Sequence, residues 1–329
     1  MKINILFEIA DTPKGGGNQF LRGLKEAFKK KGVYSEIEDA DVVLFNSYQF
    51  IDKVLKVRKK YPDKFFVHRI DGPIRLYNTM EDRRDSVTNA TNKYIADATI
   101  YQSEWSKKAN LEMGLEPNSY EAVITNGVDD TVFNRTGKKA FSENGRTKII
   151  ASSWSTNINK GFEVYKYLDD TLDFSKYEMI FVGNSPVQFQ NIKSFGPKDS
   201  KGLAETLKQQ DIYITASKKE TCSNSLIEAL ACGLPVVCYN DGGNPEILNG
   251  AGFLFEHQEE IPGLLEQVVE QYDGLQKKIQ IHNIMETAQV YIDFFDKILE
   301  SSNGARKKLS LKGIWDIKAA LWRWKHSGR

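Results

Sequence analysis

Two glutamates eight positions apart, Glu220 and Glu228, mark the segment whose residues best suit binding chemistry. This segment, 211–248, reads DIYITASKKETCSNSLIEALACGLPVVCYNDGGNPEIL, a pattern that predicts a strand, a small polar loop and a helix from about residue 224. The unpaired amides and positive dipole end of a helix N-terminus suit a phosphate. The two carboxylates can accept hydrogen bonds from the hydroxyls of a sugar and a ribose. The alternative is an ordinary surface loop and helix with solvated glutamates.

A lysine lies in a similar position after an earlier strand. The segment 151–165 reads ASSWSTNINKGFEVY, and its Lys160-Gly161 pair stands at an expected helix start. An ammonium group at this place can neutralise a phosphate. We therefore predict that Lys160 contacts the phosphate, the alternative being an ordinary surface lysine.

Glycines follow the first expected strand. Lys14 precedes Gly15, Gly16 and Gly17, and a helix is expected directly afterwards. Glycine lets a backbone approach a phosphate without a Cβ atom in the way. A flexible turn explains the same residues, so Gly16 and Gly17 are candidates that need a second observation.

Ionisable residues also end the third expected strand, at His68, Arg69 and Asp71. Burying such groups without partners is costly, so their presence here indicates a ligand or an internal pairing. Asp71 has two open interpretations, an acceptor-side base or the salt-bridge partner of Arg69.

The elements that must position these residues form two successive series of strands and helices. In the first half we expect strands at 3–9, 41–47, 64–70, 98–103 and 122–127, with helical stretches at 18–31, 50–61 and 103–113. After a polar segment, 129–146, strands are expected at 148–153, 178–183, 211–217 and 235–240. Alternating strands and helices predict α/β domains with parallel sheets, whose ligands gather at the carboxyl ends of the strands.

The segment 211–248 resembles glycosyltransferase family 4, whose members have the GT-B fold of two Rossmann-like domains. That family carries two glutamates with seven residues between them, then E-A-L/M-A-x-G-x-P-V and G-G-x-x-E. The matching residues here are Glu220, Glu228, Ala229, Leu230, Ala231, Gly233, Pro235, Val236, Gly242, Gly243 and Glu246. The resemblance implies a retaining, metal-independent glycosyltransferase with a UDP- or GDP-sugar donor.

The resemblance also implies roles for individual residues. Glu220, Lys160 and His68 would be the catalytic residues, with Glu220 holding the hydroxyls of the donor sugar and Glu228 binding the ribose. The remaining donor-binding residues would be Gly16 and Gly17 at the diphosphate, Gly196 at the nucleobase, the backbone of Thr221, Cys222 and Ser223 at the sugar, and the amides of Asn224, Ser225 and Leu226 at the diphosphate.

Two departures from the family pattern affect these expectations. Many members have Gly-Phe-Gly after the first glutamate, where this chain has Thr221, Cys222 and Ser223. Members also carry an arginine five or six residues before the lysine, at positions occupied here by Ser155 and Trp154. The hydroxyls of Ser153 or Ser155, or the guanidinium of Arg69, are the candidates to replace that arginine.

The domain boundaries follow from these patterns. We expect an acceptor-side Rossmann-like domain at 1–135, a donor domain at 136–302 and a basic amphipathic tail at 303–329. The tail has eight basic residues and one acidic residue, although the whole chain has a net charge of only +1. Its residues 311–326 suit either the surface of an anionic membrane or docking on the first domain.

Composition excludes several classes of protein. The near-zero net charge argues against a general nucleic-acid binder, and no apolar run approaches the roughly 20 residues that cross a bilayer. The three cysteines do not have the spacing of a zinc site, and the resemblance implies that no metal or cofactor is needed. We expect a cytoplasmic protein, at the inner face of the membrane if the tail binds lipid, with a glycan or lipid-linked acceptor. The alternatives are a non-catalytic relative that binds nucleotide sugars or glycans, and a GT-B sugar epimerase.

Overall fold

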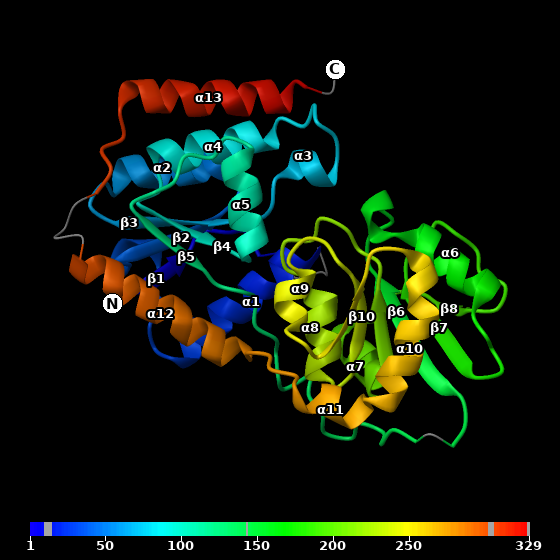
Figure 1. Cartoon of the computed structure of the whole chain (residues 1–329). Coiled ribbons are helices and arrows are strands. Elements are labelled where there is room, and N and C mark those ends of the chain that lie inside the picture. The colour runs from blue at the N-terminus through cyan, green and yellow to red at the C-terminus, as the bar shows by residue number, and fades with distance from the viewer. Residues whose placement is uncertain (10–14, 143, 302–305, 328–329) are drawn as a thin grey trace. The chain divides into compact units, whose positions relative to one another are not determined.

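The computed structural model describes residues 1–9, 15–142, 144–301 and 306–327. It contains two parallel sheets flanked by helices, which confirms the predicted α/β class (Figure 1). The chain divides into two compact units. Unit 1 consists of Met1–Asn126 and Ile284–Arg329, and unit 2 is Gly127–Asn283.

The sheet of unit 1 has the strand order β1-β2-β3-β4-β5 with every pair parallel. The strands are β1 (Ile3–Ile5), β2 (Val42–Asn46), β3 (Phe65–Ile70), β4 (Ala98–Tyr101) and β5 (Tyr120–Val123). The helices are α1 (Gly15–Lys30), α2 (Ile51–Lys60), α3 (Ile74–Tyr77), α4 (Arg84–Tyr94), α5 (Glu104–Glu112), α12 (Ile284–Ser301) and α13 (Leu311–Lys325), together with the short η1 (Ile37–Asp39).

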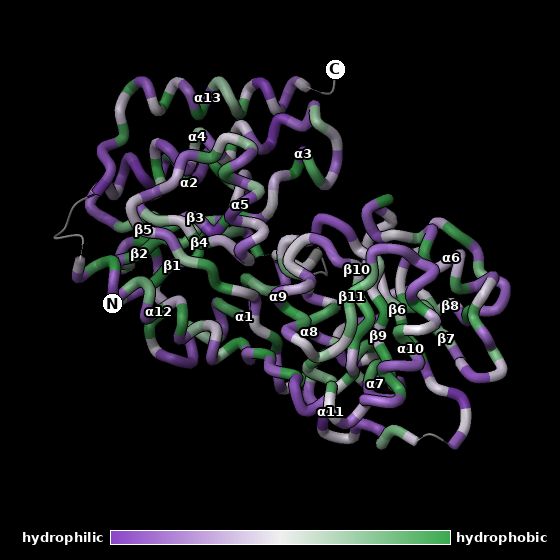
Figure 2. Tube along the Cα trace, viewed as in Figure 1, coloured by the Kyte–Doolittle hydropathy of each residue, from purple (hydrophilic) through white to green (hydrophobic). Residues whose placement is uncertain are grey.

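Two groups of helices cover opposite faces of this sheet (Figure 1). Because successive side chains of a strand point to opposite faces, Val42 and Leu44 of β2 join one core and Val43 and Phe45 join the other. Helices α1 and α12 complete the first core, and α2, α4 and α13 complete the second. Figure 2 shows the apolar residues concentrated along the strands that these helices cover.

The position of α12 differs from the predicted domain limits, which placed residues 136–302 in one domain. Tyr291 and Phe295 of α12 are fully buried in the core of unit 1. The Tyr291 ring lies 6.3 Å from that of Phe20 and 6.4 Å from that of Phe28, both on α1. The amphipathic pattern of 284–301 required a buried face, and α1 supplies the surface that covers it.

The sheet of unit 2 has the order β11-β10-β9-β6-β7-β8, again with every pair parallel. Its strands are β6 (Thr147–Ser153), β7 (Tyr177–Gly183), β8 (Lys193–Phe195), β9 (Ile212–Thr215), β10 (Val236–Tyr239) and β11 (Gly252–Phe255). The helices are α6 (Phe162–Thr171), α7 (Ser200–Lys208), α8 (Asn224–Ala231), α9 (Asn244–Leu248), α10 (Ile261–Glu270) and α11 (Tyr272–Lys277), with η2 (Ile158–Lys160) and η3 (Gln258–Glu260). The edge strands β8 and β11 were not among the predicted strands.

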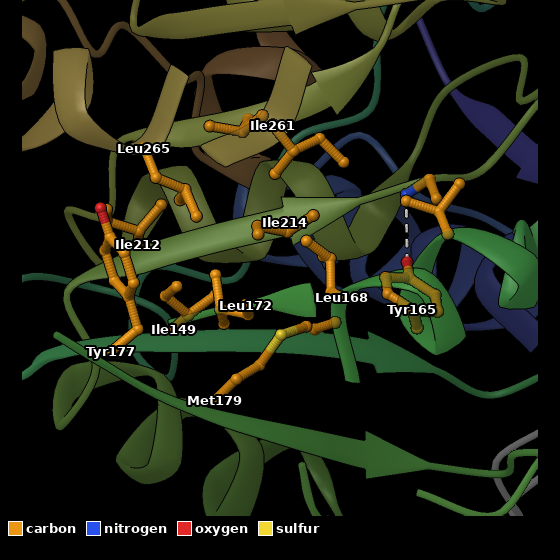
Figure 3. Close-up of a cluster of buried hydrophobic side chains, with 14 of the residues drawn as sticks. Ile149, Tyr165, Leu168, Leu172, Tyr177, Met179, Ile212, Ile214, Ile261 and Leu265 are labelled. Carbon is orange, nitrogen blue, oxygen red and sulfur yellow. Dashed lines mark hydrogen bonds between the residues drawn. The ribbon is translucent and has the colours of Figure 1, made fainter. Parts of the chain in front are cut away.

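One core of unit 2 lies beneath α6 and α10. Figure 3 shows Leu168 of α6 beside Ile214 of β9, and Leu265 of α10 beside Ile212 of the same strand. The hydroxyl of Tyr165 in the same core accepts a hydrogen bond of 3.0 Å from the amide of Ala216, directly after β9. This contact anchors the start of the loop that carries Glu220.

Helix α13 packs on unit 1 through its inner face, as the docking alternative for the tail predicted. Ile317 and Leu321 are buried in the core with α2 and α4. The Tyr94 hydroxyl of α4 donates to Asp316 at 2.6 Å, and Lys325 pairs with Asp52 of α2 at 2.7 Å. Among the described helices, none combines the length and the apolar character that crossing a bilayer requires.

The close approach of α13 to α4 requires glycine at position 313. A Cβ atom on Gly313 would lie 2.9 Å from Cγ of Tyr94. We expect Gly313→Ala to lower the free energy of unfolding by about 1–2 kcal/mol in urea titrations, because the two helices must move apart. The matched control is Gly23→Ala in α1, whose added Cβ atom would meet Ile284 at an ordinary 3.4 Å. Equal stabilities of the two variants would contradict this packing.

Candidate functional site

The carboxyl ends of β6, β9 and β10 bring three loops of unit 2 together at one edge of its sheet. The loop after β6 carries Lys160, the loop after β9 carries Glu220, and the loop after β10 carries Gly242 and Gly243. Because parallel strands end at the same edge, residues far apart in the sequence meet there.

Lys160 and Glu220 form an ion pair. The Lys160 ammonium donates a short hydrogen bond to Oε1 of Glu220, and their side chains are 18% and 17% exposed. The predicted phosphate-binding cation and sugar-binding carboxylate are therefore adjacent, and each neutralises the other in the ligand-free protein.

Gly161 explains the Lys-Gly pair of the sequence. Its φ is +69°, and a Cβ atom there would lie 2.4 Å from the carbonyl oxygen of Ala216. Only glycine lets the backbone pass so close to the end of β9 in this conformation. The passage places the preceding Lys160 beside the Glu220 loop.

The two glycines after β10 hold the Glu220 loop. The amide of Gly243 donates to the carbonyl of Glu220 at 2.7 Å, and Gly242 has a φ of +66°. The buried Asn244 donates from its side-chain amide to the carbonyl of Ser217 at 3.0 Å, at the start of the same loop. The glycine pair of the family pattern therefore positions Glu220.

We expect Gly242→Ala to disrupt this arrangement. The added Cβ atom would lie 2.3 Å from the carbonyl oxygen of Glu220. The clash and the left-handed backbone together should cost about 2–3 kcal/mol of unfolding free energy and should displace Glu220. Urea titration measures the cost. Gly250→Ala is the control, since Gly250 has a similar φ of +78° but its added Cβ atom would meet only the Lys278 side chain, at 3.9 Å. Similar losses in both variants would mean that the clash with Glu220 is unimportant.

Helix α8 begins next to this ion pair, at the predicted place. Its N-cap is Ser223, whose hydroxyl accepts a hydrogen bond of 3.4 Å from the amide of Leu226. Ser225 is half-buried beside the cap, and its hydroxyl lies 3.2 Å from that of Ser223. The first turn of α8 is therefore an ordered helix N-terminus of the kind that binds phosphate.

Glu228, one turn into α8, is half-buried. Burial raises the pKa of its carboxyl to about 8, and no described residue forms a hydrogen bond or ion pair that compensates the charge. A buried carboxylate without a partner is unfavourable in the ligand-free protein. A ligand with hydroxyl donors would relieve that cost.

The other predicted donor residues of unit 2 have mixed positions. Cys222 and Leu226 are buried in the core, so only their backbone can reach a ligand, while Thr221 and Asn224 are half-buried. Gly196 is exposed directly after β8.

The serines proposed to replace the missing arginine serve the loop itself. Ser153 is buried and donates to the carbonyl of Ser155 at 2.7 Å, and the Ser155 hydroxyl accepts from the amide of Asn157 at 3.1 Å. Both hydroxyls are thus engaged with the backbone of their own loop. The idea that they substitute for an arginine receives no support from their surroundings.

In unit 1, His68 is a buried residue of β3. Its Nε2 lies 2.9 Å from the carbonyl oxygen of Ser47, its Nδ1 lies 3.2 Å from Oδ1 of Asn92, and its ring stacks on Phe45 at 4.4 Å. Burial lowers the pKa of its imidazole to about 4, so the ring is neutral at physiological pH. With both nitrogens and one ring face engaged, its surroundings are those of a core histidine and not those of the predicted contact to a sugar.

Arg69 is also enclosed within unit 1. Its guanidinium donates to Asn46 at 2.7 Å, to Asn126 at 2.7 Å and to Asp71 at 3.1 Å, and it has no exposed surface. Of the two predicted roles of Asp71, the structure therefore shows the second, in which Asp71 is the salt-bridge partner of Arg69. The Asp71 carboxylate nevertheless keeps 32% of its side-chain surface exposed at the end of β3.

The predicted glycine loop has a different conformation. Gly15, Gly16 and Gly17 form the first turn of α1, and Lys14 lies outside the described residues. A Cβ atom at Gly17 would meet nothing within 4 Å. The segment is therefore a glycine-rich helix N-terminus in place of the expected loop.

Residues 138–281, which lie within unit 2, match the family model described as Glycosyl transferases group 1. Unit 2 is a group 1 glycosyltransferase domain. The matched residues include Lys160, Glu220 and Glu228, whereas His68, Arg69 and Asp71 lie outside them.

Similar proteins support the same assignment of this group 1 glycosyltransferase domain. A stretch of 193 residues is 25% identical to the sulfoquinovosyl transferase SQD2 of Arabidopsis thaliana, covering 53% of this chain and 36% of that protein. The chain spans less than half the length of the curated relatives it matches.

Solved structures confirm the GT-B fold. Sucrose-phosphate synthase from Thermosynechococcus elongatus matches with a TM-score of 0.73 at 14% identity, covering 92% of this chain and 100% of the other. Anabaena HepE in complex with UDP matches with a TM-score of 0.65 at 15% identity, covering 93% of this chain and 100% of the other.

Trp154 is a candidate site residue that the sequence interpretation used only as a departure from the family pattern. It is half exposed directly after β6, four residues before the η2 turn that carries Asn159 and Lys160, and the side-chain amide of Asn184 donates to its carbonyl at 2.7 Å. The signal available in the sequence was a tryptophan in the same short segment as Lys160, six positions before it. Within the described ranges, no group of three or more histidine, cysteine or acidic residues could hold a metal ion.

Proposed function

We propose that this chain transfers a sugar from a UDP- or GDP-sugar to a hydroxyl of a glycan or lipid-linked acceptor, with retention of the anomeric configuration. The observation that carries the proposal is Glu228, a partly buried carboxylate with a pKa of about 8, on the first turns of α8. The hydroxyls of a ribose would supply the hydrogen bonds that this carboxylate lacks. The adjacent Lys160–Glu220 pair supplies a cation for the diphosphate and an acceptor for sugar hydroxyls.

The proposed reaction needs charge stabilisation more than acid–base chemistry. As the bond between the sugar C1 and the diphosphate oxygen breaks, negative charge builds on the leaving diphosphate. Lys160 and the N-terminal amides of α8 stabilise that charge, since preorganised cations and dipoles are effective in a site shielded from water. The acceptor hydroxyl attacks from the face that the diphosphate leaves, and a phosphate oxygen takes its proton. We infer that no metal ion takes part.

Unit 1 would bind the acceptor and meet the membrane. The outer face of α13 carries Leu311, Trp315, Lys318 and Trp322, which share one stripe because they follow the helical repeat. Leu311, Trp315 and Trp322 are 86%, 68% and 61% exposed. Such a stripe suits the interface of an anionic bilayer, and we infer that the protein works at the cytoplasmic face of a membrane.

The test is nucleotide binding without metal. In EDTA, UDP or GDP should raise the melting temperature selectively over ADP and CMP, and the matching nucleotide sugar should then be turned over. HepE was solved with UDP-glucose, so UDP-glucose is the first donor to assay. Binding without turnover, over a panel of glycan and lipid-linked acceptors, would favour a non-catalytic relative, and no response from a folded sample would refute the donor site.

A further inference from the structure

A basic pocket of about 710 Å³ lies in unit 1, between the end of α2 and the segment that leads into α13. Five of its lining residues are cationic, Arg58, Lys59, Arg306, Lys307 and Lys308. The lining also contains one carboxylate, Asp63, and the apolar side chains of Leu309 and Ile314. The pocket therefore combines a concentrated positive charge with an apolar wall.

The inner wall of the pocket is fixed by a buried ion pair. Arg58 contacts Asp97 at 3.1 Å, with side-chain exposures of 1% and 3%. Asp97 also accepts hydrogen bonds from the backbone amides of Phe66 at 2.9 Å and Lys307 at 2.6 Å. The segment after residue 305 is thereby joined to the end of α2 and the start of β4.

Two other cationic side chains of the pocket, Arg306 and Lys307, are fixed by contacts with neighbouring backbone carbonyls and an aromatic ring. Arg306 donates to the carbonyl of Asp63 at 3.2 Å and lies over the Phe65 ring at 4.4 Å. The Lys307 ammonium donates to the carbonyls of Asn92 and Lys93. The site is thus held in shape by contacts that need no ligand.

Two cations remain available at the rim. Lys59 and Lys308 are exposed, and neither forms an ion pair with any residue that the structure describes. Five cations face two carboxylates, Asp63 and the buried Asp97, so the net charge of the pocket is +3. A pocket of this charge attracts an anion, and its polar rim offers two ammonium groups to it.

Within unit 1, the pocket is separate from the polar residues that end β3. It adjoins Phe65, the first residue of β3, whereas Asp71 follows the carboxyl end of that strand. It is lined by Ile314 at the start of α13, the helix that exposes the stripe of Leu311, Trp315 and Trp322. A ligand in the pocket would therefore lie beside the proposed membrane-facing surface and at the opposite end of β3 from Asp71.

We propose that this pocket binds the phosphate group of an anionic lipid headgroup, a proposal that rests on the membrane contact described under Proposed function. Lys59 and Lys308 pair with the phosphate oxygens, and Leu309 and Ile314 contact the apolar part of the lipid. Trp315 and Trp322 enter the interface of the bilayer, where aromatic side chains are favoured. Each lysine near an anionic surface contributes enough to change membrane affinity several-fold.

The experiment measures binding of the full-length protein to vesicles by flotation. Phosphatidylcholine vesicles with about one third phosphatidylglycerol are compared with phosphatidylcholine alone, at fixed salt because surface electrostatics are screened. We expect selective binding to the anionic vesicles and a roughly tenfold weaker affinity in Lys59→Gln/Lys308→Gln. The charge-matched control is Lys30→Gln/Lys108→Gln, which removes two exposed lysines of α1 and α5 and should bind almost as the parent does.

A further double variant and a measurement with inorganic phosphate distinguish the ways in which the proposal could be wrong. Trp315→Ala/Trp322→Ala should weaken vesicle binding while keeping the preference for anionic lipid. A preference that is unchanged in the Lys59/Lys308 variant, or lost equally in the control, would overturn the pocket. If inorganic phosphate raises the melting temperature but the protein does not bind vesicles, the ligand of the pocket is a free phosphate and not a lipid headgroup. All variants should keep their thermal response to UDP or GDP, so a failed membrane proposal is distinguishable from a failed donor site.

Discussion

Replacing Glu228 by glutamine is expected to stabilise the ligand-free protein at pH 8 but not at pH 5. Burial raises the pKa of this carboxyl from 4.5 to about 8. The carboxyl therefore contributes its full stability below pH 4.5, and that contribution is lost as the pH rises towards 8. Glutamine has nearly the same shape and stays neutral, so the variant should gain about 2–4 kcal/mol over the parent at pH 8.

The same variant should lose nucleotide affinity. An ionised carboxylate can accept hydrogen bonds from both ribose hydroxyls, whereas an amide offers one oxygen and no charge. We expect the Kd for the preferred nucleotide to rise about tenfold or more at pH 8. Urea titrations at the two pH values and calorimetric binding measure the two effects, with Glu205→Gln on the exposed side of α7 as the control. A stability difference that is independent of pH would show that Glu228 is not a buried acid.

Replacing Lys160 by alanine is expected to lower kcat by about 100- to 1000-fold, the size of effect seen when one preorganised charge is removed from a transition state. Lys160 is the described cation that contacts Glu220, and no arginine stands at the family position before it. Its loss should affect the chemical step more than the fold, because the ion pair is only partly buried. Steady-state rates with the preferred donor measure the change.

A neighbouring lysine provides the matched control for this experiment. Lys218 lies in the loop after β9, the loop that also carries Glu220, and pairs with Glu163 at 2.9 Å. Lys218→Ala should change kcat less than threefold, since an exposed ion pair contributes little. If Lys160→Ala also stays within threefold of the parent, the proposed role in stabilising the diphosphate is wrong.

The local part of the candidate site could be predicted from the sequence. Glu220, Ser223 and Glu228 belong to one strand–loop–helix segment, so their order along the chain fixes much of their arrangement. The glycines after β10 could be recognised from the family pattern, but their contact with the carbonyl of Glu220 depends on the neighbouring strands of the sheet. The pairing of Lys160 with Glu220 required the folded sheet as well.

The residues at the end of β3 show what the sequence could not provide. His68 and Arg69 have polar side chains at a strand end, which suits both a ligand site and an internal network. Their partners Asn46, Asn92 and Asn126 come from three other segments, and no spacing in the sequence announces those contacts. Polar groups that look unpaired in a sequence can find hydrogen-bond partners among tertiary neighbours.

Helix α12 returns the chain to unit 1 after unit 2 is complete, so the two units are not two successive halves of the gene. A recombination event with a single crossover near residue 126 would join residues 1–126 of a relative to the α12 of this chain. Tyr291 and Phe295 of α12 would then have to pack on an α1 from a different protein. Exchange of unit 1 between relatives therefore requires two crossovers, which transfer 1–126 and 284–329 together. Unit 2, in contrast, is one uninterrupted segment, 127–283, that a single cassette can replace.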